Sequence, residues 1–253
     1  MNIDAYLQRI NYRGSRAPTA DTLRALQVAH LLSVPFENLS IHAGEPIVLE
    51  DEALFDKIVI RRRGGFCYEL NGLFSALLRG LGFKVEMLSA GVANAEEGTF
   101  GPDFDHMVLM VTLGERWLAD VGFGDSFLQP LLLDYGREQT ETRRAYKVVS
   151  DNDHLILMQR ESNGEWNNQY RFNLQPFSYP DYAGMCHYHQ TSPESHFTSG
   201  RICTRATPEG RITLSEMRLI TTDQKGVKQE RLLKDEEEYN TTLREHFGIA
   251  MSH

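Results

Sequence analysis

The spacing of hydrophobic residues along the chain changes near residue 84. Before that point apolar residues recur every three or four positions, as they do on one face of an α-helix. Helix ends are predicted between these stretches at Val34-Pro35, Gly64-Gly65 and Gly82. The recurring apolar positions are Leu7 and Ile10, then Leu23 and Leu26, then Leu54 and Ile58, then Leu70, Phe74, Leu77, Leu78 and Leu81. We therefore predict a helical bundle over residues 1–83.

From Lys84 onward, short segments rich in Val, Leu and aromatic residues alternate with turn residues, which predicts antiparallel strands. These segments are 84–92, 106–113, 116–123, 144–150, 154–160, 166–173 and 211–222. Tyr239, Leu243 and Phe247 recur every four residues and predict a helix over 235–247. The expected fold class is α+β, with the bundle at 1–83, an antiparallel β-barrel or sheet domain at 84–198, and an α/β lid at 199–253.

Charge and composition exclude several classes of protein. The 253 residues include 26 Lys and Arg against 35 Asp and Glu, a net charge of −9, which argues against a nucleic-acid partner. The longest apolar runs fall far short of the ~20 residues of a membrane span, and the first residues do not resemble an export signal. Three cysteines at irregular spacing fit a reducing compartment and argue against a disulfide framework. We expect a cytoplasmic protein without a membrane segment.

Cys67 is the first candidate for chemistry. It follows Gly64-Gly65 and opens the helix predicted from Leu70 onward. Unpaired backbone N–H groups and the positive end of the helix dipole favour a thiolate there, so we expect a lowered pKa for this thiol. Cys67 could equally be a small core residue, because free cysteine is among the most buried residue types.

His106 and Asp120 are the candidates for a base and its orienting carboxylate. A histidine that takes the thiol proton and an aspartate that fixes the imidazole would complete a Cys-His-Asp triad of the cysteine-protease type. The two residues lie on consecutive predicted strands, and a two-residue turn at Gly114-Glu115 would put them on opposite faces of the sheet. We therefore predict an odd-numbered loop or a bulge, which puts them on one face as diagonal neighbours.

Five blocks, in this order along the chain, carry a resemblance to a known family. They are 34–39 (VPFENL), 62–71 (RRGGFCYELN), the histidine His106, 120–124 (DVGFG) and 191–197 (TSPESHF). Together they resemble the arylamine N-acetyltransferase family. The resemblance implies transfer of an acetyl group from acetyl-CoA to Cys67, then to an arylamine or arylhydrazine, by a ping-pong scheme in which Cys67, His106 and Asp120 are catalytic.

The same resemblance implies further site residues. Phe36, Tyr68, Phe123 and Phe197 would line the acceptor pocket, and Gly122 and Gly124 would let acetyl-CoA approach the backbone closely. Glu37 and Arg63 would form a buried or half-buried ion pair that holds the catalytic loop. The backbone N–H of Cys67 is the candidate oxyanion donor. Arg61 and Arg62 would face solvent or the phosphates of CoA.

Other residues and motifs bear on metal binding and on alternative functions. The spacing of a zinc site is absent from the cluster Cys186, His187, His189, His196 and Cys203, so we expect no metal. No dinucleotide or P-loop fingerprint occurs either, which argues against a nicotinamide cofactor or a P-loop nucleotide site. A cysteine hydrolase or transglutaminase-like amidase would use the same triad order, with water or a protein amine as acceptor. A non-catalytic module that binds an aromatic ligand stays open as well. The expected partners are small molecules, and the sequence leaves monomer and homodimer open.

Overall fold

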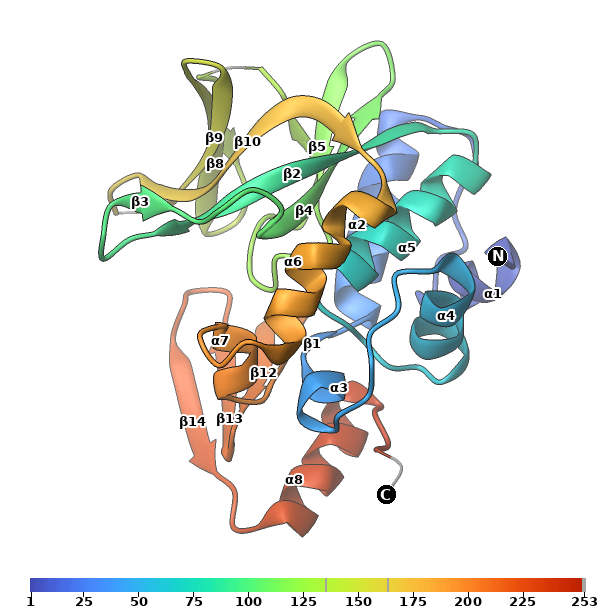
Figure 1. The fold of residues 1–253 in the computed structure, drawn as a ribbon, viewed down its shortest axis with the longest axis vertical. Helices are drawn as coiled ribbons and strands as arrows, with labels where there is room; N and C mark the ends of the chain where they lie inside the picture. The colour runs from blue at the N-terminus through green and yellow to red at the C-terminus, as the bar shows by residue number, and fades with distance from the viewer. Residues whose placement is uncertain (135, 163, 252–253) are drawn as a thin grey trace.

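The first third of the chain folds into helices packed around one buried helix (Figure 1). The computed structural model describes residues 1–134, 136–162 and 164–251. Asn2 and Thr19 cap the first two helices through their side chains, and Val34 is extended before Pro35, where the second helix ends. The elements are α1 (Ile3–Arg9), α2 (Ala20–Ser33), α3 (Leu39–His42), α4 (Asp51–Phe55), the π-turn η1 (Asp56–Ile60) and α5 (Cys67–Gly80). These bounds confirm the helices predicted over residues 1–83.

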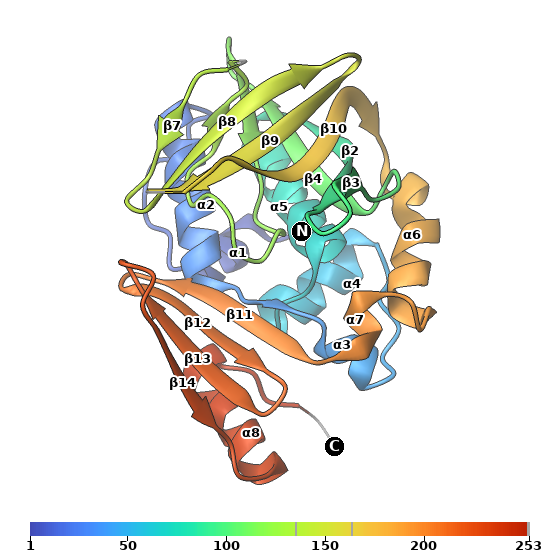
Figure 2. The same ribbon diagram turned by 90° about the vertical axis from the view of Figure 1, so that its left-hand side faces the viewer.

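The middle of the chain forms a nearly closed antiparallel barrel beside these helices (Figures 1 and 2). Its strands are β2 (Lys84–Asn94), β3 (Thr99–Phe100), β4 (His106–Thr112), β5 (Arg116–Ala119), β6 (Leu131–Leu132), β7 (Gln139–Thr140), β8 (Arg144–Asp151), β9 (His154–Glu161) and β10 (Asn167–Phe177). They pair in the order β6-β5-β4-β2-β10-β9-β8-β7, with β3 added beside β2. The strands predicted between 84 and 173 are confirmed, with ends shifted by a few residues.

A second antiparallel sheet lies toward the C-terminus, and an N-terminal segment joins its edge (Figure 2). Its order is β1-β11-β12-β13-β14, so that β1 (Phe36–Glu37) pairs with β11. The other elements are β11 (Ile202–Thr207), β12 (Gly210–Ser215), β13 (Arg218–Asp223), β14 (Lys228–Leu232), α8 (Glu236–Thr242) and η2 (Leu243–Phe247). The single strand predicted over 211–222 is wrong: the segment is the hairpin β12–β13, which turns at Glu216 in the left-handed region with φ 47°.

Two helices that the hydrophobic pattern did not predict connect the barrel to the second sheet. They are α6 (Tyr179–Thr191) and α7 (His196–Ser199). Only Tyr182, Cys186 and His189 of α6 are buried, so its apolar stripe is too sparse to stand out. Ser178 and Asp181 form a capping box that starts α6.

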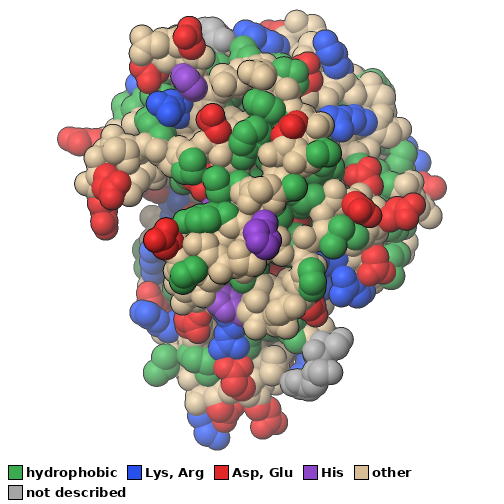
Figure 3. Space-filling view, viewed as in Figure 1, with side chains coloured by type: hydrophobic (Ala, Val, Ile, Leu, Met, Phe, Trp, Pro, Cys, Tyr) green, Lys and Arg blue, Asp and Glu red, His purple; other side chains and the backbone are tan. Residues whose placement is uncertain are grey.

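Three hydrophobic cores lie within the described ranges 1–134, 136–162 and 164–251. The first joins α1, α2 and α5 to β2, β4 and β5, the second fills the barrel, and the third lies between the C-terminal sheet and α8. Because the first core crosses residue 84, helices and barrel hold one another in place; the three-domain division stays a prediction. On the face seen in Figure 3, basic and acidic side chains are interspersed. In the described part of the chain, no helix is long and apolar enough to cross a membrane.

Candidate active site

The loop before α5 fixes the position of Cys67. Glu69 Oε2 accepts a hydrogen bond from the Phe66 N–H at 3.1 Å, and Lys57 Nζ lies 2.7 Å from Glu69 Oε1. A Cβ on Gly64 would stand 2.0 Å from the Pro35 carbonyl oxygen, so the loop passes β1 at a distance that only glycine permits. Cys67 therefore opens α5 on a closely packed, hydrogen-bonded loop.

The predicted ion pair between Glu37 and Arg63 is confirmed and is buried. Nitrogen and oxygen are 3.0 Å apart, with side chains 0% and 4% exposed. Arg63 Nη2 also donates to Ser40 Oγ. Burial alone would raise the pKa of Glu37, but the positive charges of Lys57 and Arg63 and the Leu39 N–H lower it. Arg61 and Arg62, which directly precede Arg63, are exposed.

His106 and Asp120 meet as the odd-loop prediction requires. The register pairs Thr112 with Arg116, which leaves a three-residue loop between β4 and β5. His106 Nε2 lies 2.8 Å from Asp120 Oδ2, and both side chains are almost fully buried. The hairpin prediction is confirmed: the odd loop puts both side chains on one face of the sheet.

Asn71 is a site residue that the sequence analysis missed. Its Nδ2 donates to Asp120 Oδ1 at 2.8 Å, and its Oδ1 accepts from the Val121 N–H at 2.9 Å. The Gly122 N–H donates to the same Asp120 oxygen at 2.8 Å. Because Asn71 follows Cys67 by four residues on α5, the two share one helix face, and that spacing was the available signal. Asp120 thus has a partner on each oxygen.

The thiol of Cys67 does not behave as its helix position alone suggested. Burial raises the pKa of Cys67, and the negative charges of Asp105 and Asp120 raise it further, against a hydrogen bond with the Met107 backbone that lowers it. The predicted lowering of this pKa is therefore wrong for the unassisted thiol. A thiolate at this position requires a base beside it to receive the proton.

Cys67 and His106 open onto a cavity of about 400 Å³ between the barrel, α7 and the second sheet. Of the residues that the resemblance implied, Phe36, Gly122, Phe123 and Phe197 line it. The His106 and Phe123 rings are 5.2 Å apart, and the Phe36 and Phe197 rings are 6.1 Å apart. The aromatic walls and the reactive groups therefore share one cavity.

Tyr68 and Gly124 are not among the residues that line this cavity. Tyr68 is fully buried, and its hydroxyl donates to the Phe104 carbonyl oxygen at 2.5 Å. Gly124 has φ +91°, and a Cβ there would stand 3.6 Å from the Phe36 ring. Tyr68 therefore contacts the backbone of the segment that carries Asp105, which lines the cavity. The left-handed conformation of Gly124 places its backbone against the Phe36 ring.

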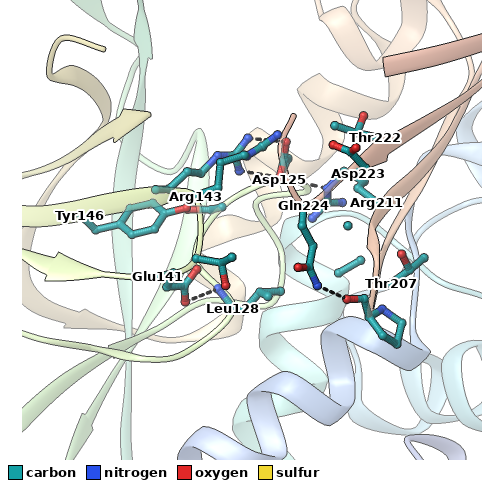
Figure 4. A pocket seen from close by; sticks show the side chains of 16 residues that line it. Asp125, Leu128, Glu141, Arg143, Tyr146, Thr207, Arg211, Thr222, Asp223 and Gln224 are labelled. Carbon is teal, nitrogen blue, oxygen red and sulfur yellow. Dashed lines mark hydrogen bonds and ion pairs between the residues drawn. The ribbon is translucent and has the colours of Figure 1, made fainter. Parts of the chain in front are cut away.

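The segment after Gly124 is tied to both sheets by Asp125 (Figure 4). Arg144 on β8 donates to both carboxylate oxygens at 2.7 and 3.0 Å, and Arg211 Nε on β12 lies 3.0 Å from Oδ1. A second cavity of about 130 Å³ lies beside this cluster. Asp125 therefore links the segment that follows Phe123 to the barrel and to the C-terminal sheet.

The histidines and cysteines between 186 and 203 do not gather into a metal site. Cys186 and Cys203 are buried free thiols, and His189 contacts Ser195. Among the residues that the structure describes, no group of three or more His, Cys, Asp or Glu could hold a metal ion.

Comparison with known proteins places the chain in a family. A family model described as N-acetyltransferase matches residues 19–253. The arylamine N-acetyltransferase of Escherichia coli is 32% identical over 98% of this chain and 89% of its own length, and human arylamine N-acetyltransferase 1 is 33% identical over 99% and 95%. The chain belongs to the arylamine N-acetyltransferase family. The resemblance noted from its five sequence blocks is thereby confirmed.

Solved arylamine N-acetyltransferases share the whole fold. The Salmonella typhimurium enzyme superposes with a TM-score of 0.92 at 30% identity, over 99% of this chain and 92% of its own. The Mycobacterium marinum enzyme in complex with CoA superposes with a TM-score of 0.90 at 35% identity, over 98% and 93%. The α+β architecture with helices, barrel and second sheet is therefore that of the family.

Proposed function

We propose that this chain is an acetyl-CoA-dependent arylamine N-acetyltransferase in which Cys67, His106 and Asp120 form the catalytic triad. The observation that carries the proposal is the buried His106–Asp120 pair, 2.8 Å apart, at a cavity that Cys67 also lines. Membership of the family supports the activity, and a solved relative holds CoA. Neither Tyr68, assigned to the acceptor pocket, nor Gly124, assigned to acetyl-CoA contact, lines this cavity.

In the first half-reaction, Cys67 takes the acetyl group. Asp120 accepts the hydrogen bond from His106 Nε2–H, which leaves Nδ1 free to receive the proton of the Cys67 thiol. The sulfur attacks the thioester carbonyl carbon, the bond from that carbon to the CoA sulfur breaks, and His106 returns the proton to the leaving thiolate. We assign the backbone N–H of Cys67, at the first turn of α5, to the developing oxyanion.

In the second half-reaction, the arylamine nitrogen attacks the acetyl carbon on Cys67. His106 Nδ1 accepts the proton that the nitrogen loses, and the carbon–sulfur bond breaks to release the amide. Asp120 stabilises the imidazolium that forms in both halves. Because burial raises the pKa of Cys67, proton transfer to His106 is the step on which nucleophilicity depends.

Flat apolar walls suit a flat acceptor. Phe36, Phe123 and Phe197 surround the cavity, and aromatic rings pack against one another in offset or edge-to-face arrangements. An arylamine or arylhydrazine fits this environment. Gly122 lines the cavity beside Cys67, and a Cβ there would stand 2.8 Å from Cys67 Cα, so the glycine lets its loop pack directly against α5.

Steady-state kinetics test the proposal against the hydrolase interpretation. A ping-pong enzyme gives parallel double-reciprocal lines when acetyl-CoA is varied at several arylamine concentrations. Intersecting lines, or hydrolysis of peptide or ester substrates without CoA, would contradict the transferase mechanism. Cytoplasmic location and a monomeric or dimeric state stay predictions.

A further inference from the structure

A second aspartate–histidine pair lies beside the triad. Asp105 directly precedes His106, lines the active-site cavity and is 15% exposed. His189 Nε2 on α6 lies 3.2 Å from Asp105 Oδ1, and the Val92 N–H donates to Oδ2 at 3.1 Å. A Cβ on Gly101 would stand 2.4 Å from Oδ2, so a glycine makes room for this carboxylate.

The surroundings of His189 hold Asp105 as an anion. His189 Nδ1 lies 3.0 Å from Ser195 Oγ, and Ser195 Oγ accepts from the Phe197 N–H. Ser195 therefore holds the imidazole through Nδ1, while Nε2 faces the Asp105 carboxylate. Burial would raise the pKa of Asp105, but the nearby His189 and the hydrogen bond from the Val92 N–H outweigh it and lower the pKa.

The other charged side chains that line the cavity do not neutralise the negative charge of Asp105. Among the described residues that line the cavity, Glu216 adds a second negative charge and Arg201 supplies the positive one. Arg201 is already engaged: its guanidinium contacts both oxygens of Glu236 at 2.7 and 3.0 Å, and Glu216 at 3.8 Å. An acceptor in the cavity therefore meets an excess of negative charge next to His106.

We propose that Asp105, held by His189, is a specificity-determining residue that favours acceptor arylamines carrying a positive charge on the ring and disfavours those carrying a carboxylate. The inference rests on the proposed function and adds the charge class of the acceptor. Asp105 directly precedes His106 and is partly buried. Attraction or repulsion between its carboxylate and a charge on the acceptor ring changes the acceptor's binding constant by roughly tenfold per charge.

Three planar acceptors of matched shape test the proposal: 4-aminobenzamidine, 4-aminobenzamide and 4-aminobenzoate. Acceptor kcat/KM is measured for the wild type, for Asp105→Asn, and for Asp103→Asn as the control. Asp103 is an exposed carboxylate two residues earlier on the same segment. We expect Asp105→Asn to lower the amidine-to-carboxylate ratio of kcat/KM by at least about tenfold, with Asp103→Asn leaving it unchanged.

The amidine-to-carboxylate ratio of kcat/KM separates a change in specificity from structural damage, because a damaged site lowers kcat/KM for all three acceptors together. A ratio that stays within about twofold of the wild type in a folded Asp105→Asn variant would overturn the proposal. Direct titration of the wild type with benzamidine, benzamide and benzoate needs neither a folded variant nor catalysis. Benzamidine should bind most tightly; benzoate binding as tightly as benzamidine would also overturn it. If no acceptor is acetylated, the proposed function fails, and the titration still decides the inference.

Discussion

Gly122 connects the loop after Asp120 to the helix that carries Cys67. A Cβ at this position would stand 2.8 Å from Cys67 Cα, 2.8 Å from Asn71 Nδ2 and 2.9 Å from the Cys67 carbonyl oxygen. Carbon atoms in contact normally keep about 3.5–4.0 Å, so Gly122→Ala must move the loop away from α5 by roughly 0.7–1.2 Å. Two of the three neighbouring atoms are backbone, which leaves little freedom for local adjustment.

Gly122→Ala should damage catalysis more than folding. Overpacking of this kind costs about 1–3 kcal/mol, which lowers Tm by a few degrees in a protein of this size. Displacement of the Asp120 loop by about 1 Å should slow acetylation of Cys67 by roughly 10²-fold. The assay is the single-turnover rate of Cys67 acetylation, with Gly184→Ala as control, because a Cβ on Gly184 meets nothing within 4 Å. A Gly122→Ala variant whose Cys67 is acetylated at the wild-type rate would refute the reasoning.

Two further predictions concern stability. Arg63→Met should lower the free energy of unfolding by about 3–5 kcal/mol in a denaturant titration, because it leaves Glu37 buried without its partner; a loss under 1 kcal/mol would contradict this. His30 is fully buried and burial lowers its pKa to about 3, so below pH ~6.5 the unfolded chain binds a proton that the folded chain does not. Stability should therefore fall by about 1.4 kcal/mol per pH unit as pH drops from 6.5, and His30→Gln should remove that slope; an unchanged slope would contradict the assignment.

The parts of the fold that were predictable are those where the hydrophobic period is strong. The apolar stripe of α5 predicted a helix, and the apolar runs of β4 and β5, bounded by turn residues, predicted strands. The odd loop between these strands followed from the requirement that His106 and Asp120 share one face of the sheet. The β12–β13 hairpin was hidden because Glu216 turns the chain without glycine, proline or asparagine. Helix α6 was hidden because few of its residues are apolar and buried.

The chemistry of the site was predictable in its residue types and less so in its environment. Cys67 at a helix start predicted a lowered pKa, whereas burial, which depends on the whole fold, raises it. The family resemblance implied that Tyr68 lines the acceptor pocket, yet successive helix residues face different directions, and the Tyr68 ring is fully buried. Asn71 carried a usable signal in its spacing from Cys67.

The measurement that tests the central claim most directly is the intact mass of the protein after mixing with acetyl-CoA. The account predicts one added acetyl group on the wild type and none on Cys67→Ala, and removal of that group when an arylamine is added. A wild type that stays unmodified, or a Cys67→Ala variant that is acetylated and discharged in the same way, would contradict the assignment of Cys67 as the nucleophile.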